Sequence, residues 1–445
     1  MAEPAPAGIV RRIYGNLGRL LGGKAAAGLI GLAYMVIAAR ALGPADYGVL
    51  VLVHAFAMTV GGIVEFPGWH AVVRYGARAL ARDDRPGLAR LLRFVGSVET
   101  IGGVAAVLTA AILAPILGPR LGWSATALAF AIPYSLAVLA SVRSTAAGYL
   151  QLVGRFDLLG WHNVVAPSVR LAGALVAWTM GLGLAGFLIV WLVAALAEWA
   201  AMWLLAIGEA RRRLRGTALL GGLDGVLAQN PGIWRFMIAA NADVTLAELA
   251  GRIAPLVIGW VLGAEAVGLY AVAQRATVVI AQPAQILGQA AYAELARLAA
   301  VVGHGPRLRR ALLHCIGIAL LAALPVLLLL FLFAGQVVTA IGGRTFAGAA
   351  DVMIWLTVAR GLSLAGPPAS SALAALGRPG LSVSANLFAN LGLLPLLPLL
   401  LSRFGLIGAG WHAVLQAAVA STLLLWLALR HSRSVPPSFA SPGVA

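Results

Sequence analysis

Charge is scarce in this chain: only 11% of its 445 residues are Asp, Glu, Lys or Arg, while 61% are hydrophobic. A soluble domain needs a far more polar surface, whereas a membrane helix needs about 20 mainly apolar residues, and this sequence has many such runs. Cysteine is nearly absent. The single Cys315 lies in an apolar stretch, so no disulfide can form within the chain and we expect a buried, inert thiol.

Motifs of several functional classes are also missing. The sequence has no P-loop pattern, no nucleophile elbow and no His, Cys or Asp cluster with metal-ligand spacing, so we expect neither ATP hydrolysis nor a metal or other cofactor. A net charge of +17 would suggest nucleic-acid binding in a soluble protein. Here the basic residues lie in short loops without an aromatic platform, so we expect no nucleic-acid partner.

The chain contains an internal duplication. Residues 42–48 (LGPADYG) return as residues 262–268 (LGAEAVG), an offset of 220. In the same order, Gly154-Arg155 matches Gly377-Arg378, and the GLAG at 183–186 matches the GLIG at 405–408. Three ordered matches at nearly one offset indicate two structural repeats. Duplicated membrane bundles of this size usually enclose a substrate site between their halves.

Apolar runs between helix breakers predict an all-α polytopic membrane protein of about twelve transmembrane helices, six in each repeat. An even number per repeat gives the two halves the same orientation, so the repeats are parallel. We expect an N-terminal lobe over 1–207, an inter-lobe linker over 208–232, a C-terminal lobe over 233–430 and a disordered tail over 431–445. The predicted spans lie near 17–40, 46–72, 92–114, 124–149, 158–180, 184–207, 233–261, 267–292, 311–333, 348–375, 380–401 and 406–430.

Arginine is distributed unevenly between the two sides of the predicted bundle. One side carries clusters at 74–93, 211–215 and 297–310, whereas the opposite side has only Arg40, Arg120, Arg344 and Arg403. Because cytoplasmic loops carry an excess of basic residues, both termini and the linker are predicted to be cytoplasmic. The lipid bilayer is the predicted surrounding partner.

Polar residues recur on matching faces of the two repeats. On the second predicted helix, His54 and Glu65 share one face. The offset of 220 makes them equivalent in sequence position to Gln274 and Gln285 of the eighth helix. That eighth-helix face also carries further polar residues, namely Arg275, Gln282 and Gln289. The pattern favours a shared polar cavity. Helix-to-helix hydrogen bonding is the alternative explanation for both faces.

The seventh predicted helix carries a polar stripe of Asn241, Thr245, Glu248 and Arg252. Glu248 precedes Arg252 by four residues, the favourable order for an ion pair on a helix. The stripe can therefore line a cavity, or it can be a self-neutralised structural pair. Among the other intramembrane groups, His162 is expected to be a satisfied core histidine, and Arg170 with Asn163 to be structural. Glu99 and Glu198 are candidates either to carry a proton or to lie at helix ends. Arg143 and Arg360 have no assigned function.

The repeated segments resemble those of Wzx-type polysaccharide or O-antigen flippases of the multidrug/oligosaccharidyl-lipid/polysaccharide (MOP) exporter superfamily. The resemblance lies in residues 39–48 (ARALGPADYG), 73–75 (VRY), 262–270 (LGAEAVGLY), 376–379 (LGRP) and 405–409 (GLIGA). It implies a MATE-like bundle of two six-helix lobes around a central cavity, as a multi-pass protein of the bacterial inner membrane. The implied cargo is a polyprenyl-diphosphate-linked oligosaccharide, moved by alternating access for polysaccharide or lipopolysaccharide synthesis, and the protein would not be an enzyme.

The resemblance also implies different functions for the different polar residues. Arginine forks suit phosphate oxygens, so Arg275 and Arg252 are candidates for the diphosphate headgroup. Asn241, Gln274, Gln282, Gln285 and Gln289 are candidates for the glycan-lining surface. His54, Glu65 and Glu248 are candidates for ion coupling. A polysaccharide polymerase and a chain-length regulator are candidate protein partners.

Two other functions remain open at the level of sequence. A drug–cation antiporter of the same fold would favour acidic and aromatic cavity faces over Gln and Arg. A membrane-embedded polymerase or glycosyltransferase would need a sizeable extramembrane loop with convergent carboxylates or arginines, and none is visible in the sequence.

Overall fold

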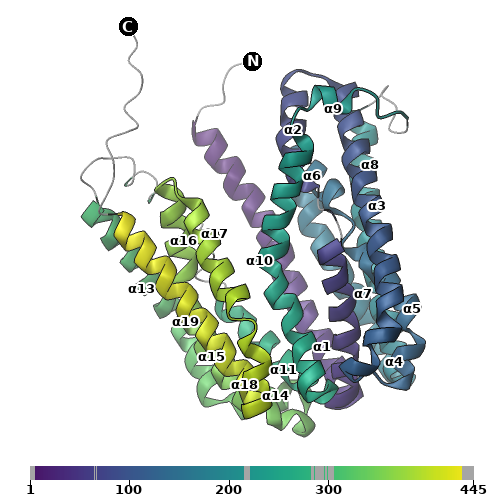
Figure 1. The fold of residues 1–445 in the computed structure, drawn as a ribbon, viewed down its shortest axis with the longest axis vertical. Coiled ribbons are helices and arrows are strands. Elements are labelled where there is room, and N and C mark those ends of the chain that lie inside the picture. Colours follow the sequence, from purple (N-terminus) through teal and green to yellow (C-terminus); the bar gives the residue numbers. More distant parts are fainter. Residues whose placement is uncertain are drawn as a thin grey trace. The chain divides into compact units, whose positions relative to one another are not determined.

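The structure, a computed structural model, describes residues 6–64, 66, 68–214, 221–281, 285, 295, 298 and 305–432; the side chains of 6–21, 242–244, 247, 279 and 281 lie outside this description. Every regular element in the described residues is a helix (Figure 1). The chain divides into two compact units, Met1–Arg252 and Ile253–Ala445. Helix α10 (Ile233–Leu262) crosses this division, so its first twenty residues belong to unit 1.

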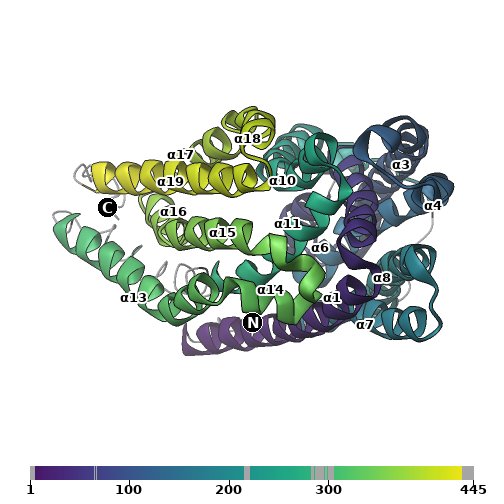
Figure 2. The ribbon, with the colours of Figure 1, turned by 90° about the horizontal axis from the view of Figure 1, so that it is seen from below.

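Unit 1 is a bundle in which the long helix α1 lies along α7, and α7 lies along α8 (Figure 2). Short helical pieces between α3 and α7 fill its interior. Its elements before α10, in chain order, are α1 (Pro6–Val64), α2 (Trp69–Ala81), α3 (Arg85–Leu117), η1 (Pro119–Leu121), α4 (Ala125–Ala129), α5 (Ala131–Tyr134), η2 (Ser135–Ala140), α6 (Ser144–Leu152), α7 (Phe156–Thr179), α8 (Gly183–Arg213) and α9 (Val226–Gln229).

Unit 2 is built around α15, which packs along α19, α11 and α13. Figure 2 shows α15 and α19 running side by side. Its elements after α10 are α11 (Ala264–Thr277), η3 (Val278–Ala281), α13 (Gly305–Leu332), α14 (Ala334–Gly342), η4 (Arg344–Ala349), α15 (Ala350–Ser363), α16 (Gly366–Ala375), α17 (Pro379–Leu387), η5 (Phe388–Gly392), α18 (Leu396–Phe404) and α19 (Leu406–His431).

The membrane-spanning character predicted from composition is visible in the described helices. Six are long and apolar enough to cross a bilayer, or seven if the bent pair Pro379–Gly392 and Leu396–Phe404 forms one span. One of them, Gly22–Val64, has 43 residues, which is about 65 Å of helix and roughly twice the hydrocarbon thickness. It covers two predicted spans with a break at Gly43. The total of twelve spans and the cytoplasmic termini remain predictions.

The duplication appears in the backbone at the helix ends. After α6, Gly154 has φ 75°, and Arg155 donates its N–H to Leu150 O over 2.8 Å. At the matching position after α16, Gly377 has φ 73°, and the Arg378 N–H reaches Leu373 O over 2.9 Å. A positive φ at this place lets the chain turn out of a helix while its last carbonyls stay bonded. The shared Gly-Arg motif therefore encodes one turn twice.

Two predicted spans are not continuous helices. The span predicted over 46–72 is interrupted, because α1 ends at Val64 and α2 begins at Trp69. The sequence has Pro67 in this interval, and proline lacks the N–H that would continue the helical ladder. The span predicted over 124–149 is divided among α4, α5, η2 and α6, and the chain leaves helical geometry at Arg143, where φ is −150°.

The break at Arg143 is stabilised by a buried carboxylate from α3. Glu99 is 0% exposed, and its two oxygens accept the backbone N–H groups of Ser144 and Thr145, the second over 2.7 Å. The first N–H groups of a helix have no partner within the helix, and they carry partial positive charge. Glu99 supplies what they lack, so this intramembrane acid caps the start of α6.

A bend in unit 2 is stabilised by side-chain hydrogen-bond donors, whereas the break in unit 1 is stabilised by an acceptor. The segment from α17 to α18 bends by 42° at the π-helical turn η5. The bend frees backbone carbonyls, and α19 satisfies two of them. His412 Nε2 lies 2.9 Å from Leu393 O, and Gln416 Nε2 donates to Asn390 O over 2.9 Å.

Candidate functional site

A polar cavity of about 350 Å³ lies inside unit 1. Its walls come from the end of α1, the start of α2, the break before α6 together with α6 itself, and α10. Both helix interruptions of unit 1 therefore open onto it. The lining residues are Gly62, Trp69, Ser141, Arg143, Ser144, Ala147, Gln151, Thr245, Glu248, Leu249 and Arg252.

The α10 side of the cavity is the polar stripe predicted for the seventh helix. Thr245 Oγ1 is 3.1 Å from Asn241 Oδ1 and 3.3 Å from Gly62 O of α1. One turn further along, Arg252 Nη2 donates to the Glu248 carboxylate. A spacing of three or four residues places these groups on one helix face. The structure thus places Thr245, Glu248 and Arg252 in the cavity wall, whereas Asn241 contacts Thr245 but does not itself line the cavity.

Arg252 is fixed to α1 by three contacts. Its Nη1 donates to Met58 O over 2.7 Å, and its own carbonyl accepts a hydrogen bond of 3.2 Å from Thr59 Oγ1. Its guanidinium lies against Gly62, where a Cβ would collide with Nη1. Glycine is therefore required at position 62 for the arginine to reach its place.

Arg143 is the second cation of the cavity, and it comes from the break before α6. Its Nη1 forms an ion pair with Glu198 of α8. The same turn of α8 is held by His162 of α7, whose Nε2 is 2.9 Å from Glu198 O. The sequence left Arg143 unassigned and predicted a satisfied core histidine at His162. The structure places both beside Glu198 in one connected arrangement next to the cavity.

Both arginines of the cavity are paired with carboxylates but keep N–H donors that these pairs do not use. We call Arg143, Glu248 and Arg252 the charged wall. Each arginine is about one-third exposed and has a carboxylate partner, so neither charge is left uncompensated in an apolar bundle. An arginine offers five N–H donors, more than these contacts use. Glu248 is 55% exposed, so its carboxylate is accessible from the cavity.

Three further lining residues are uncharged, and we call them the neutral wall: Trp69 of α2 with Ser144 and Gln151 of α6. Sequence reasoning missed all three. The signal available was weak, because each is an isolated polar or aromatic residue near a helix end. Only the spacing of Ser144, Ala147 and Gln151, which gives one helical face, was visible in advance.

The remaining candidates lie elsewhere. Gln274 of α11 has its Nε2 3.5 Å from Tyr270 OH, Arg275 is exposed at the last turn of that helix, and Gln285 is exposed; all three belong to unit 2. Glu65, Gln282 and Gln289 lie outside the described residues.

His54 belongs to a separate polar and aromatic cluster in the interior of unit 1. Its Nδ1 is 3.0 Å from Tyr134 OH, and its Nε2 is 3.3 Å from Arg170 Nη2. Arg170 also donates to Tyr34 OH over 3.2 Å and lies over the Trp191 ring, 4.6 Å from its centroid. An arginine can only donate, so Nε2 accepts and the ring proton is assigned to Nδ1. Protonating His54 would break its bond with Arg170.

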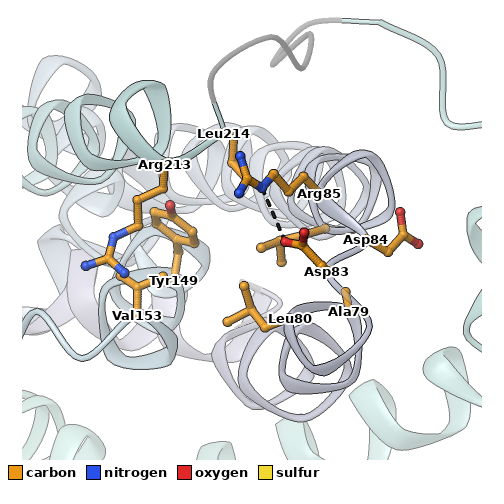
Figure 3. A pocket seen from close by; sticks show the side chains of 10 residues that line it. Ala79, Leu80, Asp83, Asp84, Arg85, Tyr149, Val153, Arg213 and Leu214 are labelled. Atoms are coloured by element: carbon orange, nitrogen blue, oxygen red, sulfur yellow. Dashed lines mark hydrogen bonds and ion pairs between the residues drawn. The ribbon is translucent and has the colours of Figure 1, made fainter. Parts of the chain in front are cut away.

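A second pocket of about 260 Å³ lies where the α2–α3 turn faces the ends of α6 and α8 (Figure 3). Asp83 and Arg85 of the turn pair with each other on one side, and Arg213 stands beside Tyr149 on the other. Its two acids, Asp83 and Asp84, balance its two arginines, Arg85 and Arg213, so this pocket lacks the excess of positive charge that the cavity has. Tyr149 OH is buried without a partner in the described residues.

A network of ion pairs beside this pocket joins α7 to α8. The nearly buried Glu209 binds Arg155 and Arg213, over 2.5 and 2.6 Å. Arg155 also binds Asp157, and its hydrogen bond is the main reason that the pKa of Asp157 is lowered. Asp157 lies at the start of α7, one residue before the predicted span. These contacts fix the helix ends and leave the cavity as the candidate site.

Comparison with known proteins identifies the family. A family model described as polysaccharide biosynthesis protein matches residues 37–351. The inner membrane protein YghQ of Escherichia coli (strain K12) is 30% identical over 291 residues, which are 65% of this chain and 82% of that protein.

Two solved structures share the fold. One is a multidrug resistance MATE family transporter of the MOP superfamily in an inward-facing conformation, with a TM-score of 0.70, 18% identity and coverage of 93% of this chain and 96% of that chain. Lipid II flippase MurJ in an inward closed conformation has a TM-score of 0.67, 12% identity and coverage of 90% and 85%. The chain therefore belongs to the polysaccharide biosynthesis protein family, as a multi-pass protein of the bacterial inner membrane with the fold of MATE transporters and MurJ.

Proposed function

We propose that this protein translocates a polyprenyl-diphosphate-linked oligosaccharide across the inner membrane by alternating access. Family membership and the MATE and MurJ fold support this proposal. The observation that carries it is the cavity of unit 1, which is lined by both Arg143 and Arg252.

The physical problem of such transport is desolvation. A diphosphate cannot cross hydrocarbon unless its lost hydration is replaced by cations and hydrogen bonds. Arg143 and Arg252 provide guanidinium forks of the kind that bind phosphate oxygens. We propose that the diphosphate replaces Glu248 on Arg252, while the polyprenyl chain stays in the bilayer and the glycan occupies polar space.

The proposed translocation requires two lobes that move against each other. We propose lobes over 1–207 and 233–430, joined by a cytoplasmic linker over 208–232, with both termini cytoplasmic. Arg275 and Gln274 of α11 are proposed to contact the same substrate from the second lobe, with Gln282, Gln285 and Gln289 further along the glycan. His54 and Glu65 remain proposed ion-coupling residues.

The test is accumulation of substrate in cells. Deleting the gene should leave lipid-linked repeat units on the cytoplasmic leaflet, and restoring the wild-type gene should clear them. Arg252→Gln should fail to clear them and Arg252→Lys should do so partly, because lysine keeps the charge but loses the fork. Arg430→Gln, a change at a surface arginine stacked on Trp426, is the matched control and should behave as wild type.

Thermal unfolding of each purified variant separates loss of function from loss of folding. If no lipid-linked intermediate accumulates after deletion, and export continues in a strain without a redundant transporter, the proposed function is wrong. Normal clearance by stably folded Arg252→Gln would instead remove Arg252 from the site.

A further inference from the structure

The neutral wall of the cavity carries polar groups that the protein itself does not use. The Trp69 indole N–H, the Ser144 hydroxyl and the Gln151 amide have no hydrogen-bond partner in the described part of the chain, and all three residues are partly exposed and line the cavity. By contrast, Arg252 and Arg143, which also line the cavity, already hold carboxylates. Uncommitted donors and acceptors that face a cavity are available to a ligand.

The neutral wall is held in a fixed geometry. Gly148 of α6 lets the backbone at Trp69 approach so closely that a Cβ there would lie 2.9 Å from the Trp69 Cα. The Trp69 ring also stacks on His70, with 3.5 Å between ring centroids. Since Glu99 fixes where α6 begins, it fixes the direction of Ser144 and Gln151 as well. A preorganised wall loses little entropy when it binds a ligand.

The chemistry of this wall differs from that of the charged wall. A phosphate requires cations, which the neutral wall lacks. A pyranose has an apolar C–H face and a rim of neutral hydroxyls, which match an indole ring flanked by an amide and a hydroxyl. We infer that Trp69, Ser144 and Gln151 form the subsite for the first sugar of the substrate, next to the diphosphate on the charged wall; this inference rests on the proposed function.

The size of the cavity limits how much of the glycan is recognised. About 350 Å³ is near the lower end of the range for small-molecule sites, roughly 300 to 1,000 Å³. It accommodates a diphosphate and one sugar, so the remaining sugars of the repeat unit extend beyond the neutral wall. This subsite therefore selects the sugar attached to the phosphate and tolerates variation further along the chain.

The test compares two synthetic lipids bound to the full-length protein in lipid nanodiscs. One is a short polyprenyl diphosphate without sugar, and the other carries a single hexose on the diphosphate. Trp69→Leu and Gln151→Ala should weaken binding of the hexose lipid by about tenfold and change binding of the sugar-free lipid by less than twofold. Trp69→Phe should recover most of the loss, because it keeps an aromatic face. Trp178→Leu, an exposed tryptophan on α7, is the control and should change neither affinity.

The outcomes separate the inference from the proposed function. Arg252→Gln should weaken both lipids, because both carry the diphosphate. If Trp69→Leu and Gln151→Ala affect both lipids equally, or affect neither, the sugar subsite is wrong while the diphosphate site stands. If the wild-type protein binds neither lipid, the proposed function itself fails. Adding two further sugars to the hexose lipid should change the wild-type affinity by less than threefold, and a larger gain would contradict recognition of the first sugar alone.

Discussion

Gly43 and Gly263 have the same backbone conformation 220 positions apart, with φ 69° and ψ 177° at the first and φ 84° and ψ 177° at the second. Each ends one helix and starts the next, and a side chain at this φ would be strained. Pro44 follows the first glycine and suits the first turn of a helix, whereas Ala264 follows the second. The repeated LG motif is therefore kept by a backbone requirement, which leaves the neighbouring polar residues able to differ between the repeats.

Gly62→Ala should abolish transport without unfolding the protein. The new methyl group would collide with Arg252 Nη1 and displace the guanidinium from Met58 O. We expect a loss of at least about tenfold in clearance of lipid-linked intermediates. Stability should fall by about 1 kcal/mol or less, since one flexible side chain moves and alanine favours the helix. Gly28→Ala on the same helix meets open space and is the matched control. Equal activity in the two variants would show that the position of Arg252 is unimportant.

Glu248→Gln should bind the polyprenyl diphosphate more tightly than the wild type. Glu248 is the group that the diphosphate must replace on Arg252, and a half-exposed ion pair of this kind is worth up to about 1 kcal/mol. The expected gain is therefore up to about fivefold, measured by titration of the protein in nanodiscs. Asp351→Asn, a change at an exposed acid in the first turn of α15, should have no effect. Weaker binding by Glu248→Gln would indicate that Glu248 contacts the ligand directly.

Glu99→Ala should destabilise unit 1 substantially. The variant leaves two N–H groups at the start of α6 without an acceptor and opens a cavity where the side chain is fully buried. Loss of a buried charge-assisted cap is expected to cost about 2–4 kcal/mol, measured as a lowered Tm in detergent. Glu99→Gln keeps one carbonyl acceptor and should lose less. The adjacent Thr100→Ala, at an exposed position, should have a Tm close to wild type. A wild-type Tm for Glu99→Ala would rule out the capping function.

His54→Gln should make transport independent of pH if His54 is the coupling residue. Glutamine can still accept a hydrogen bond from Arg170, but it cannot take up the proton that would break that bond. Wild-type initial rates are expected to depend on pH, and the variant rates to stay flat. His431→Gln, at the end of α19, controls for a histidine change outside the cluster. An unaltered pH profile in His54→Gln would transfer the coupling assignment to Glu65 or Glu248.

The sequence predicts the membrane helices and the repeat well, because apolar runs and positive-φ glycines act locally. It predicts helix interruptions less well. The apolar run over 124–149 looks continuous because the cause of the break at Arg143 is distant. Glu99, which stabilises the new helix start, lies 45 residues away in the chain from Ser144.

The candidate site shows the same limit. The α10 stripe could be predicted because its members are spaced along one helix. Arg143 could not be assigned because its partner, Glu198, lies on another helix. Trp69 and Gln151 were missed since nothing local distinguishes them from other residues at helix ends. Contacts between residues far apart in the sequence determine the site, whereas local sequence patterns determine the helices.

The bond from Arg252 to Met58 O has a consequence for how the two halves are joined. By the duplication, residues 233–252 descend from the same ancestral segment as the start of α1, and so they belong to the second copy. By their contacts they are bound to the first unit. The boundary between the two sequence repeats and the boundary between the two compact units therefore differ by about twenty residues. About twenty residues of the second repeat therefore pack within the unit that is otherwise formed by the first repeat. Neither repeat, if expressed alone, would carry the complete cavity.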